Sequence, residues 1–455
     1  MPTKPKIVTL TNSSVDVVNA IRNSASVNYR DHVPLATPDA ESIRTIGAIL
    51  MDNPQLLNEF SSGLINRIGL VVATSKMWDN PLRMFKRGRL DYGETVEEIF
   101  VDLAKGFTYD QGISETNLFK REKPDVRSAF HVMNFQKFYK VSVSPDQYRS
   151  AFLSWDGVTD LLERIISRMT TSANYDEFNV MKYMLGRKIL EGRLKPVAIP
   201  AISAENSKTI VSDIKGASNT LEFMSNDNNP AGVYNATAKD DQYLIVNAKF
   251  DSLIDVEVLA SAFHMDKATF YGHKVLVDSF GNIDNARMAQ LFDDDDSNYT
   301  ALTSAEKAAL DAIPAVLVDR DFFMIFDNLI TMRDVENGEG LYRNYWLHTW
   351  KTFSVSPFAN ALVFVPGTPA VSSVTVSPST ATLAEGSKLA LTATVATADF
   401  APKSVIWSSA DSTKVTVNAA GIIQVVGGDA EDTVVITATS TFDSTKTGTC
   451  TVTIA

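Results

Sequence analysis

Residues 76–115 read KMWDNPLRMFKRGRLDYGETVEEIFVDLAKGFTYDQGISE, and this stretch says more about the fold than any other. Residues 76–89 carry five basic side chains against one acidic side chain, a local charge of +4. Residues 91–115 carry seven acidic side chains against one basic side chain, a local charge of −6. Such a segment has little apolar surface for a core. We expect it to fold back at Gly88 or Gly93 into a long two-stranded ribbon, basic towards its tip and acidic along its return.

A lone ribbon of this kind is only marginally stable in water, so it needs a neighbouring surface on which to lie. Opposed charges across such a contact set its orientation and register more than its affinity. One interpretation is therefore a contact with another molecule. The alternative is a hairpin in solvent whose basic and acidic strands pair with each other, and the charges leave both open.

Outside the ribbon, helical periodicity is strongest over residues 145–194, where apolar side chains such as Ile165 and Met169 recur at spacings of three and four. Asn174 or Asp176 could cap a further helix there. Segments rich in β-branched and aromatic residues then follow, and residues typical of turns separate them. We expect these to be strands of one antiparallel sheet in an α+β body, at residues 315–319, 322–327, 341–354 and 359–365.

The composition changes at VPGTP, residues 365–369, where two prolines around a glycine make a stiff connector. Residues 371–455 contain 17 threonines and no arginine, and apolar residues alternate there at period two. That pattern predicts an all-β sandwich. Trp407 would be its buried aromatic side chain, and Gly421 would occupy a turn with positive φ.

Composition excludes several classes of protein. The chain has 455 residues, of which 45% are hydrophobic and 21% charged, and this suits a folded protein of about three domains. Its net charge of −12 has the wrong sign for a protein that coats nucleic acid. The single cysteine, Cys450, cannot form an intrachain disulfide and is expected to be a small buried hydrophobe. We expect no signal peptide and no membrane span.

Motifs for catalysis or metal binding are missing from the sequence. There is no phosphate loop, no H-E-x-x-H and no G-x-S-x-G. The acidic run at residues 293–296 does not fit a calcium loop, because Thr300 stands where glycine is required. His264 and His273 lack enough partners for a zinc site. We therefore predict no catalytic residue, no cofactor and no metal, as in a structural protein.

Several strings of sequence, in order over residues 15–365, closely resemble the major capsid protein of the small podoviruses that replicate DNA by protein priming. Residues 371–455 resemble the bacterial immunoglobulin-like (Ig-like) domain of group 2, which that family carries at its C-terminus. The strings include DVVNAIRNS (16–24), HVPLAT (32–37), RIGLVV (67–72), NPL (80–82), VLVD (316–319), GLY (340–342) and FANA (358–361).

The resemblance implies the Johnson-type fold of tailed-phage capsids, an α+β body with an extended β-hairpin loop, followed by an all-β Ig-like sandwich. It divides the chain into an N-terminal arm and helix (1–66), the extended loop (67–110), a peripheral platform with a spine helix (111–196 and 314–366), an axial domain (197–313), a linker (367–372) and the Ig-like domain (373–455).

The charged ribbon falls on the extended loop, which in the family reaches over a neighbouring subunit. The resemblance therefore favours contacts between copies over the solvent hairpin. Six charged side chains become candidates for these contacts, although their pairings are not assigned: Lys86, Arg87, Arg89, Glu94, Glu97 and Glu98.

The implied function is that of a major capsid protein, which assembles in the bacterial cytoplasm into an icosahedral or prolate head. The implied partners are further copies of itself in pentamers and hexamers, a scaffolding protein, a portal or connector, and packaged double-stranded DNA bound without sequence specificity. The Ig-like domain would brace capsomers or adhere weakly to host cell-surface carbohydrate. Other hypotheses are an encapsulin-like cellular shell, and an adhesin or hydrolase that carries an Ig-like module.

Overall fold

The computed structural model describes residues 14–71, 78–90, 95–109, 121–153, 157–253, 273–292, 299–340 and 342–455. Glu94, Gly93, His264 and the acidic run at 293–296 lie outside these ranges. The described helices are α1 (Ser14–Ser24), α2 (Val27–His32), α3 (Ala40–Asp52), α4 (Pro54–Val71), α6 (Pro145–Ala151), α7 (Gly157–Leu190), α8 (Ser207–Thr220), α10 (Asn285–Phe292) and α11 (Ser304–Asp311).

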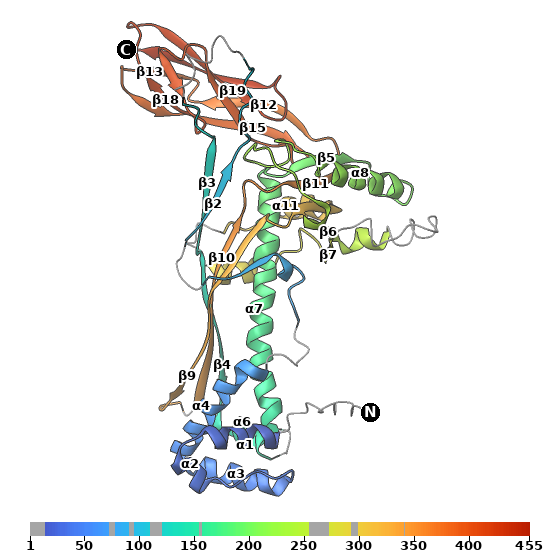
Figure 1. Cartoon of the computed structure of the whole chain (residues 1–455), viewed down its shortest axis with the longest axis vertical. Coiled ribbons are helices and arrows are strands. Elements are labelled where there is room, and N and C mark those ends of the chain that lie inside the picture. Colours follow the sequence, from blue (N-terminus) through green and yellow to red (C-terminus); the bar gives the residue numbers. More distant parts are fainter. Residues whose placement is uncertain are drawn as a thin grey trace.

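Helix α7 is the axis of the molecule. Its 34 residues span about 50 Å. Helices α1 to α4 and α6 gather around one end of α7, and the all-β C-terminal part lies at the other end (Figure 1). The helices at the first end enclose a core of their own, which includes Ile43, Phe60 and Phe152.

The prediction of a helix cap at Asn174 or Asp176 is wrong, because α7 runs through both residues without a break. The carboxylate of Asp176 is fully buried and accepts hydrogen bonds from the hydroxyl of Tyr139 (2.8 Å) and from Arg287 (Nη2, 3.0 Å). An aspartate that satisfies distant partners in the interior is not available to cap a helix. Its sequence neighbourhood alone does not reveal those partners.

One face of the N-terminal half of the axis is covered by a four-stranded sheet, the platform sheet. Its order is β1-β9-β10-β4, and β9, β10 and β4 run alongside α7 (Figure 1). The strands β9, β10 and β4 form an antiparallel group, whereas the short β1 pairs in parallel with β9. The bounds are β1 (Lys86–Arg89), β4 (Phe135–Val143), β9 (Phe323–Asn337) and β10 (Tyr342–Val355).

A second, five-stranded sheet has the order β5-β11-β8-β6-β7 and mixes parallel with antiparallel pairs. Alternate residues of β8 enter two different cores, so that Val316 and Val318 face one and Leu317 faces the other. A strand with both faces buried has a continuous apolar sequence, as β8 does. The bounds are β5 (Lys195–Ile199), β6 (Gln242–Asn247), β7 (His273–Val277), β8 (Ala315–Asp319) and β11 (Ala361–Pro366).

The expectation of one antiparallel sheet late in the chain is therefore wrong. The four predicted segments are strands, but β9 and β10 belong to the platform sheet while β8 and β11 belong to the five-stranded sheet. The chain changes sheets between Asp319 and Phe323, and again between Val355 and Ala361. Burial separates the two pairs, because β8 is buried at every position whereas much of β9 and β10 is only half-buried.

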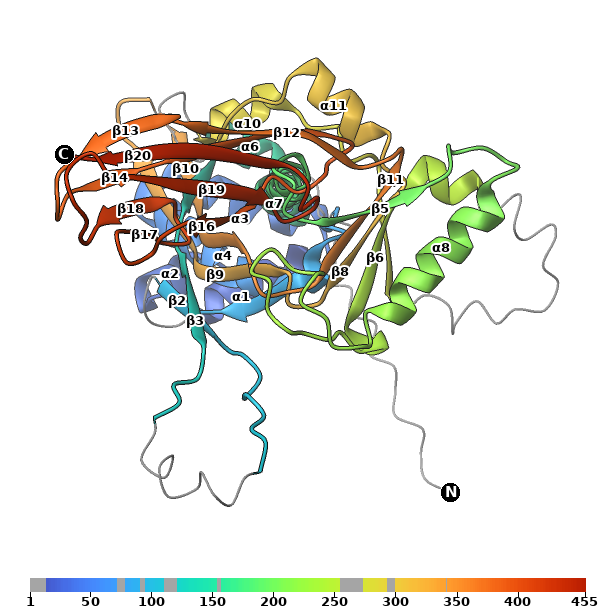
Figure 2. The same ribbon diagram turned by 90° about the horizontal axis from the view of Figure 1, so that it is seen from above.

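The ribbon also differs from the prediction. The chain does not fold back at Gly88, since β1 joins the platform sheet; instead β2 (Thr95–Val101) pairs with β3 (Val126–Val132) in antiparallel fashion. We call β2 and β3 the hairpin. Its return strand lies beyond residue 110, where the expected loop ends. Figure 2 shows residues 102–109 and 121–125 running away from the rest of the molecule.

The C-terminal part is the predicted all-β sandwich. Its strands are β12 (Ala370–Ser377), β13 (Thr380–Leu383), β14 (Lys388–Ala390), β15 (Thr392–Ala398), β16 (Val405–Ser409), β17 (Val415–Val417), β18 (Ile422–Val425), β19 (Thr433–Ser440) and β20 (Thr447–Ile454). Cys450 is fully buried and Gly421 has a φ of +77°, as predicted. Trp407 is half-buried and packs against the core.

No helix in the described ranges is long and apolar enough to cross a membrane.

Candidate assembly surface

The hairpin has two unlike faces, because successive residues of a strand point to opposite sides. Its inner face is half-buried or buried and consists of Val96, Glu98, Phe100, Arg127, Ala129 and His131. Its outer face is exposed at every position and consists of Thr95, Glu97, Ile99, Val101, Val126, Ser128, Phe130 and Val132.

The inner face fastens the hairpin to the body of its own chain. The ring of His131 lies with Nδ1 2.7 Å from the hydroxyl of Ser354 and with Nε2 3.1 Å from the carboxylate of Glu98. That carboxylate also accepts a hydrogen bond of 2.7 Å from the hydroxyl of Ser356. The ring of Phe100 stacks on Phe358 at 5.6 Å. These contacts hold the outer face in one orientation, turned away from the body.

The outer face is apolar. Five large aliphatic or aromatic side chains on it are 53–63% exposed, namely Ile99, Val101, Val126, Phe130 and Val132. Glu97 supplies the only charge on this face. A contiguous exposed patch of this kind on a folded protein marks an interaction site.

The segment that leads into the hairpin is held by a buried cluster of charges. The ammonium group of Lys86 on β1 lies 3.1 Å from Glu177 on α7 and 2.7 Å from Asp327 on β9. Lys351 on β10 pairs with the same two carboxylates, and its nitrogen lies 3.5 Å from Asp327. Three elements of the platform are thereby joined to the helix next to the start of the hairpin.

The cluster explains two shifts in pKa. Burial alone would raise the pKa of Glu177, but the ammonium groups of Lys351 and Lys86 bring it below its ordinary value. Burial would likewise lower the pKa of Lys86, but Glu177 and Asp327 raise it above its ordinary value. Both groups are therefore held in their charged forms.

The structure separates the six charged residues singled out from the sequence. Lys86 lies in the buried cluster, and Arg87 lies 2.7 Å from Asp321 of the same chain. Glu98 is on the inner face, whereas Glu97 is on the outer face and Arg89 is exposed at the end of β1. Glu94 lies outside the described residues. The contact of these six with a second copy stays a prediction, and the outer face that the hairpin offers is apolar.

Reasoning from the charges missed the residues that matter most here. The apolar side chains of the outer face lie in two seven-residue runs that contain β-branched and aromatic residues, TVEEIFV (95–101) and VRSAFHV (126–132). That composition was the signal that could have identified β2 and β3 as strands. No local signal marks Glu177 or Lys351, because their partners lie far away in the sequence.

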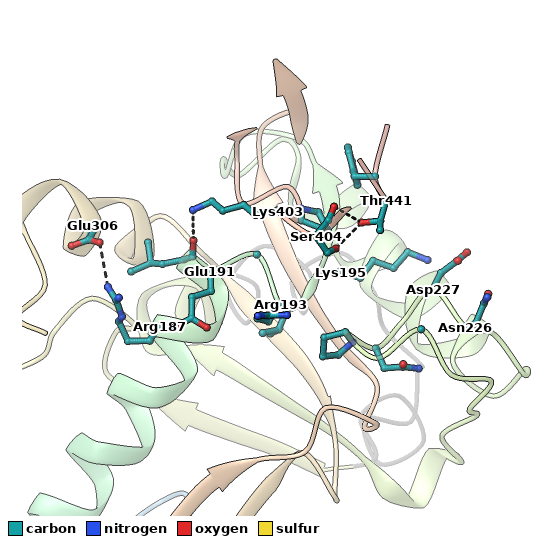
Figure 3. Close-up of a pocket in the computed structure, with 18 residues that line it drawn as sticks. Arg187, Glu191, Arg193, Lys195, Asn226, Asp227, Glu306, Lys403, Ser404 and Thr441 are labelled. Carbon is teal, nitrogen blue, oxygen red and sulfur yellow. Dashed lines mark hydrogen bonds and ion pairs between the residues drawn. The ribbon is translucent and has the colours of Figure 1, made fainter. Parts of the chain in front are cut away.

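A second feature is the junction between the Ig-like sandwich and the body (Figure 3). The ammonium group of Lys403 donates a hydrogen bond of 3.0 Å to the carbonyl oxygen of Leu190 at the end of α7. A cation at this end of a helix is favourable because the last carbonyl groups carry partial negative charge. Phe400 of the sandwich packs against the main core of the body. Beside these contacts lies an open cavity of about 660 Å³, lined in part by Arg187, Arg193 and Lys195.

Gly192 fixes how closely the two parts approach. Its φ is +67°, and a Cβ atom added there would lie 2.7 Å from the carbonyl oxygen of Ala401 and 3.0 Å from the Cα of Pro402. Across the connector, the backbone N–H of Thr368 donates a hydrogen bond of 3.1 Å to the carboxylate of Asp399. The sandwich is therefore docked against the end of α7, in addition to being linked through the chain.

Among the described residues, no group of three or more His, Cys, Asp or Glu side chains could hold a metal ion. Taken together, an α+β body with a long axial helix, a projecting hairpin and a platform sheet defines the capsid fold of tailed phages. A solved capsid structure of Staphylococcus phage Andhra shares it, with a TM-score of 0.51 and 14% identity over 65% of this chain and 86% of that one.

The chain belongs to the Phi29-like phage major capsid protein family, which it matches over residues 18–365. The major capsid protein of Bacillus phage B103 is 35% identical over 423 residues, covering 91% of this chain and 88% of that protein. Residues 370–452 match the bacterial Ig-like domain of group 2. They are also similar to an Ig-like virion protein of Serratia phage KSP90, with 46% identity over 86 residues, or 19% of this chain and 32% of that protein.

The resemblance seen in the sequence is thus confirmed in both parts and in the same order. The chain is a major capsid protein of phage virions and self-assembles into capsomers. The alternatives of a cellular shell, an adhesin or a hydrolase are not favoured.

Proposed function

We propose that each subunit lays the outer face of its hairpin on a neighbouring copy, and that this apolar contact helps to close the phage head. The observation that carries the proposal is the outer face itself, on which five large apolar side chains are more than half exposed in the single chain. Such surface favours burial, at about 25 cal/mol per Å². In a capsid, neighbouring copies of the same subunit can cover this apolar surface.

The charges play a different part in this proposal from that expected from the sequence. Lys86 and Glu98 orient the hairpin from within their own chain, through the buried cluster and the inner face. A preoriented arm loses little conformational freedom when it docks, and this makes a modest contact more effective. Contacts that are weak one by one suffice, because many repeats act together in a closed shell.

The proposal is tested by replacing Phe130 with serine and measuring the subunit concentration above which shells form. Electron microscopy and sedimentation would score the particles. We expect the threshold to rise and the folded single chain to be unaffected, since Phe130 is 63% exposed. An unchanged threshold would contradict the proposal.

For the Ig-like domain we propose bracing between capsomers, with adhesion to host carbohydrate as the alternative. The docking of Lys403 and Phe400 at the end of α7 supports bracing, because a brace must transmit force to the body. Shells of Lys403→Ala and of the unaltered protein would be heated or osmotically shocked. Bracing predicts earlier rupture of the variant, whereas equal resistance, together with retention of intact shells on host polysaccharide, favours adhesion.

The remaining partners follow from the assignment to a phage head. We propose that the shell, icosahedral or prolate, encloses double-stranded DNA without reading its sequence, and that a scaffolding protein and a portal take part in assembly. A net charge of −12 supports weak contact with DNA, because a strongly basic wall would hold the phosphates tightly. Particles filled with and emptied of DNA should then show the same subunit contacts.

A further inference from the structure

The cavity at the junction between the sandwich and the body takes no part in the hairpin contact (Figure 3). We call it the junction cavity. Its volume of about 660 Å³ falls within the size of small-molecule sites, roughly 300–1,000 Å³. The body supplies Arg187, Arg193 and Lys195 to its walls, and the sandwich supplies Lys403 and Thr441. Both parts of the chain are therefore needed to form it.

Three carboxylates line the junction cavity, and two of them are engaged by other cations. Glu191 lies 2.8 Å from the ammonium group of Lys188, which is not a lining residue. Glu306 lies 3.5 Å from the guanidinium group of Arg187. Asp227 is exposed and is the one carboxylate left to balance the remaining basic side chains of the walls.

Those remaining basic side chains are Arg193, Lys195 and Lys403, and no ion pair within the described ranges includes any of them. Lys195 donates a hydrogen bond of 3.1 Å to the neutral side-chain oxygen of Asn228, and Lys403 donates to a backbone carbonyl. Arg193 is exposed, and Figure 3 shows it between Arg187 and Lys195. A chain with a net charge of −12 thus has a basic hollow here, which attracts anions.

The C-terminal end of α7 does little to oppose an anion in the junction cavity, because donors already cover its last carbonyl groups. The carbonyl oxygen of Lys188 accepts a hydrogen bond of 2.9 Å from the backbone N–H of Arg193. The carbonyl oxygen of Leu190 accepts one of 3.0 Å from Lys403. Carbonyl groups with such partners are no longer among the unsatisfied acceptors of the helix end.

The walls also carry groups that suit a sugar. Phe442 of the sandwich is 42% exposed, and the hydroxyl groups of Ser404 and Thr441 lie 2.6 Å apart beside it. The exposed amide of Asn226 comes from the body. A sugar ring has C–H groups on its faces and hydroxyl groups at its edge, so an aromatic ring next to hydroxyl and amide groups matches it.

We infer that the junction cavity binds an acidic saccharide, a sugar that carries a carboxylate or a phosphate. Arg193 anchors the acid group, because a guanidinium group can donate two parallel hydrogen bonds to a carboxylate or a phosphate. Lys195 and Lys403 add positive charge, and Phe442 packs on the sugar ring. The inference goes beyond both roles proposed for the sandwich, because the body supplies the anchor.

A ligand that touches both walls also strengthens the docking of the sandwich. It binds the docked arrangement and not the separated one, so its binding free energy adds to the stability of the junction. Saturation with the ligand should therefore slow limited proteolysis between β11 and β12. Gly192→Ala, which sets a Cβ atom against the backbone of Ala401, should weaken binding although glycine has no side chain to contact the ligand.

The test is calorimetric titration of the purified full-length subunit. The probe is a tetrasaccharide of alternating glucuronic acid and N-acetylglucosamine, and its uncharged counterpart is the tetrasaccharide of N-acetylglucosamine alone. We expect the acidic probe to bind at least tenfold more tightly and to lose affinity as salt is added. Arg193→Ala should weaken its binding about tenfold, because charge-assisted hydrogen bonds are lost. The control Arg149→Ala, an exposed arginine of α6 at the other end of α7, should bind as the unaltered protein does.

Three further probes separate the sources of the acid group. Glucose 6-phosphate should bind more tightly than inorganic phosphate, and equal affinities would reduce the site to an ionic contact and overturn the inference. An octathymidylate that binds more tightly than either saccharide, and loses affinity with Arg193→Ala, would assign the cavity to nucleic acid instead. Equal binding of the charged and uncharged tetrasaccharides, or an unchanged affinity in Arg193→Ala, would also overturn it. Slower proteolysis with the acidic probe in the unaltered protein, but not in Arg193→Ala, would support it.

Discussion

The replacement of Phe130 by serine tests the hairpin contact quantitatively. Phe130 is 63% exposed in the single chain, and an aromatic side chain buries about 200 Å² when it is fully enclosed. About 125 Å² is therefore available for burial against a neighbour, worth about 3 kcal/mol at 25 cal/mol per Å². Each subunit contributes one hairpin, so the free energy of assembly per subunit becomes less favourable by that amount. A loss of about 3 kcal/mol raises the threshold concentration about 100-fold.

The assay is a concentration series of purified subunits, with any scaffolding partner held constant, scored by sedimentation and electron microscopy. The matched control is Ser128→Ala, which lies on the same outer face and removes no apolar surface; its threshold should stay within a factor of three. Circular dichroism should show the same unfolding temperature for all three proteins. A threshold for Phe130→Ser within threefold of the unaltered protein would refute the reasoning.

Three further outcomes are expected. Glu177→Gln leaves the buried Lys351 and the half-buried Lys86 with Asp327 as their one remaining carboxylate in the cluster, so the free energy of unfolding should fall by about 3–5 kcal/mol in chemical denaturation. Because the pKa of Glu177 is lowered on folding, its contribution should be complete above pH about 4.3 and be lost as the pH falls further, as acid titration of stability would show. Gly192→Ala places a Cβ atom against the backbone of Ala401, so limited proteolysis should cut faster between β11 and β12, whereas Gly216→Ala, with open space around it, should not change the rate.

The sequence predicted those parts of the fold that depend on local periodicity. Alternation at period two predicted the sandwich, and apolar spacing predicted the long helix. Segments rich in β-branched and aromatic residues predicted the strand character of β8 to β11. Pairing between distant segments was not predictable in this way. Such patterns identify a strand without identifying its neighbour, so β9 and β8 were placed in one sheet although they belong to two different sheets.

The candidate site shows the same limit. Charge density drew attention to residues 76–115, and the hairpin does begin there, but the structure divides the charges among different environments. Lys86 lies in the charge cluster, Glu98 on the inner face and Glu97 on the outer face. Lys86 is half-buried beside Glu177 of α7 and Asp327 of β9, and no feature near Lys86 in the sequence indicates these partners. The spacing of Ile99 and Val101, two residues apart, indicates an apolar strand face in the sequence. The carboxylates of Glu97 and Glu98 directed the prediction to charge instead.

The docking of the sandwich on the end of α7 has a mechanical consequence. The helix is about 50 Å long and carries the N-terminal helices at its other end, so it acts as a lever between two distant parts of the particle. A tilt of 5° at one end displaces the other by about 4 Å. If neighbouring sandwiches brace capsomers as proposed, we expect a difference in curvature between flat and strongly bent regions of a shell to change the spacing between them.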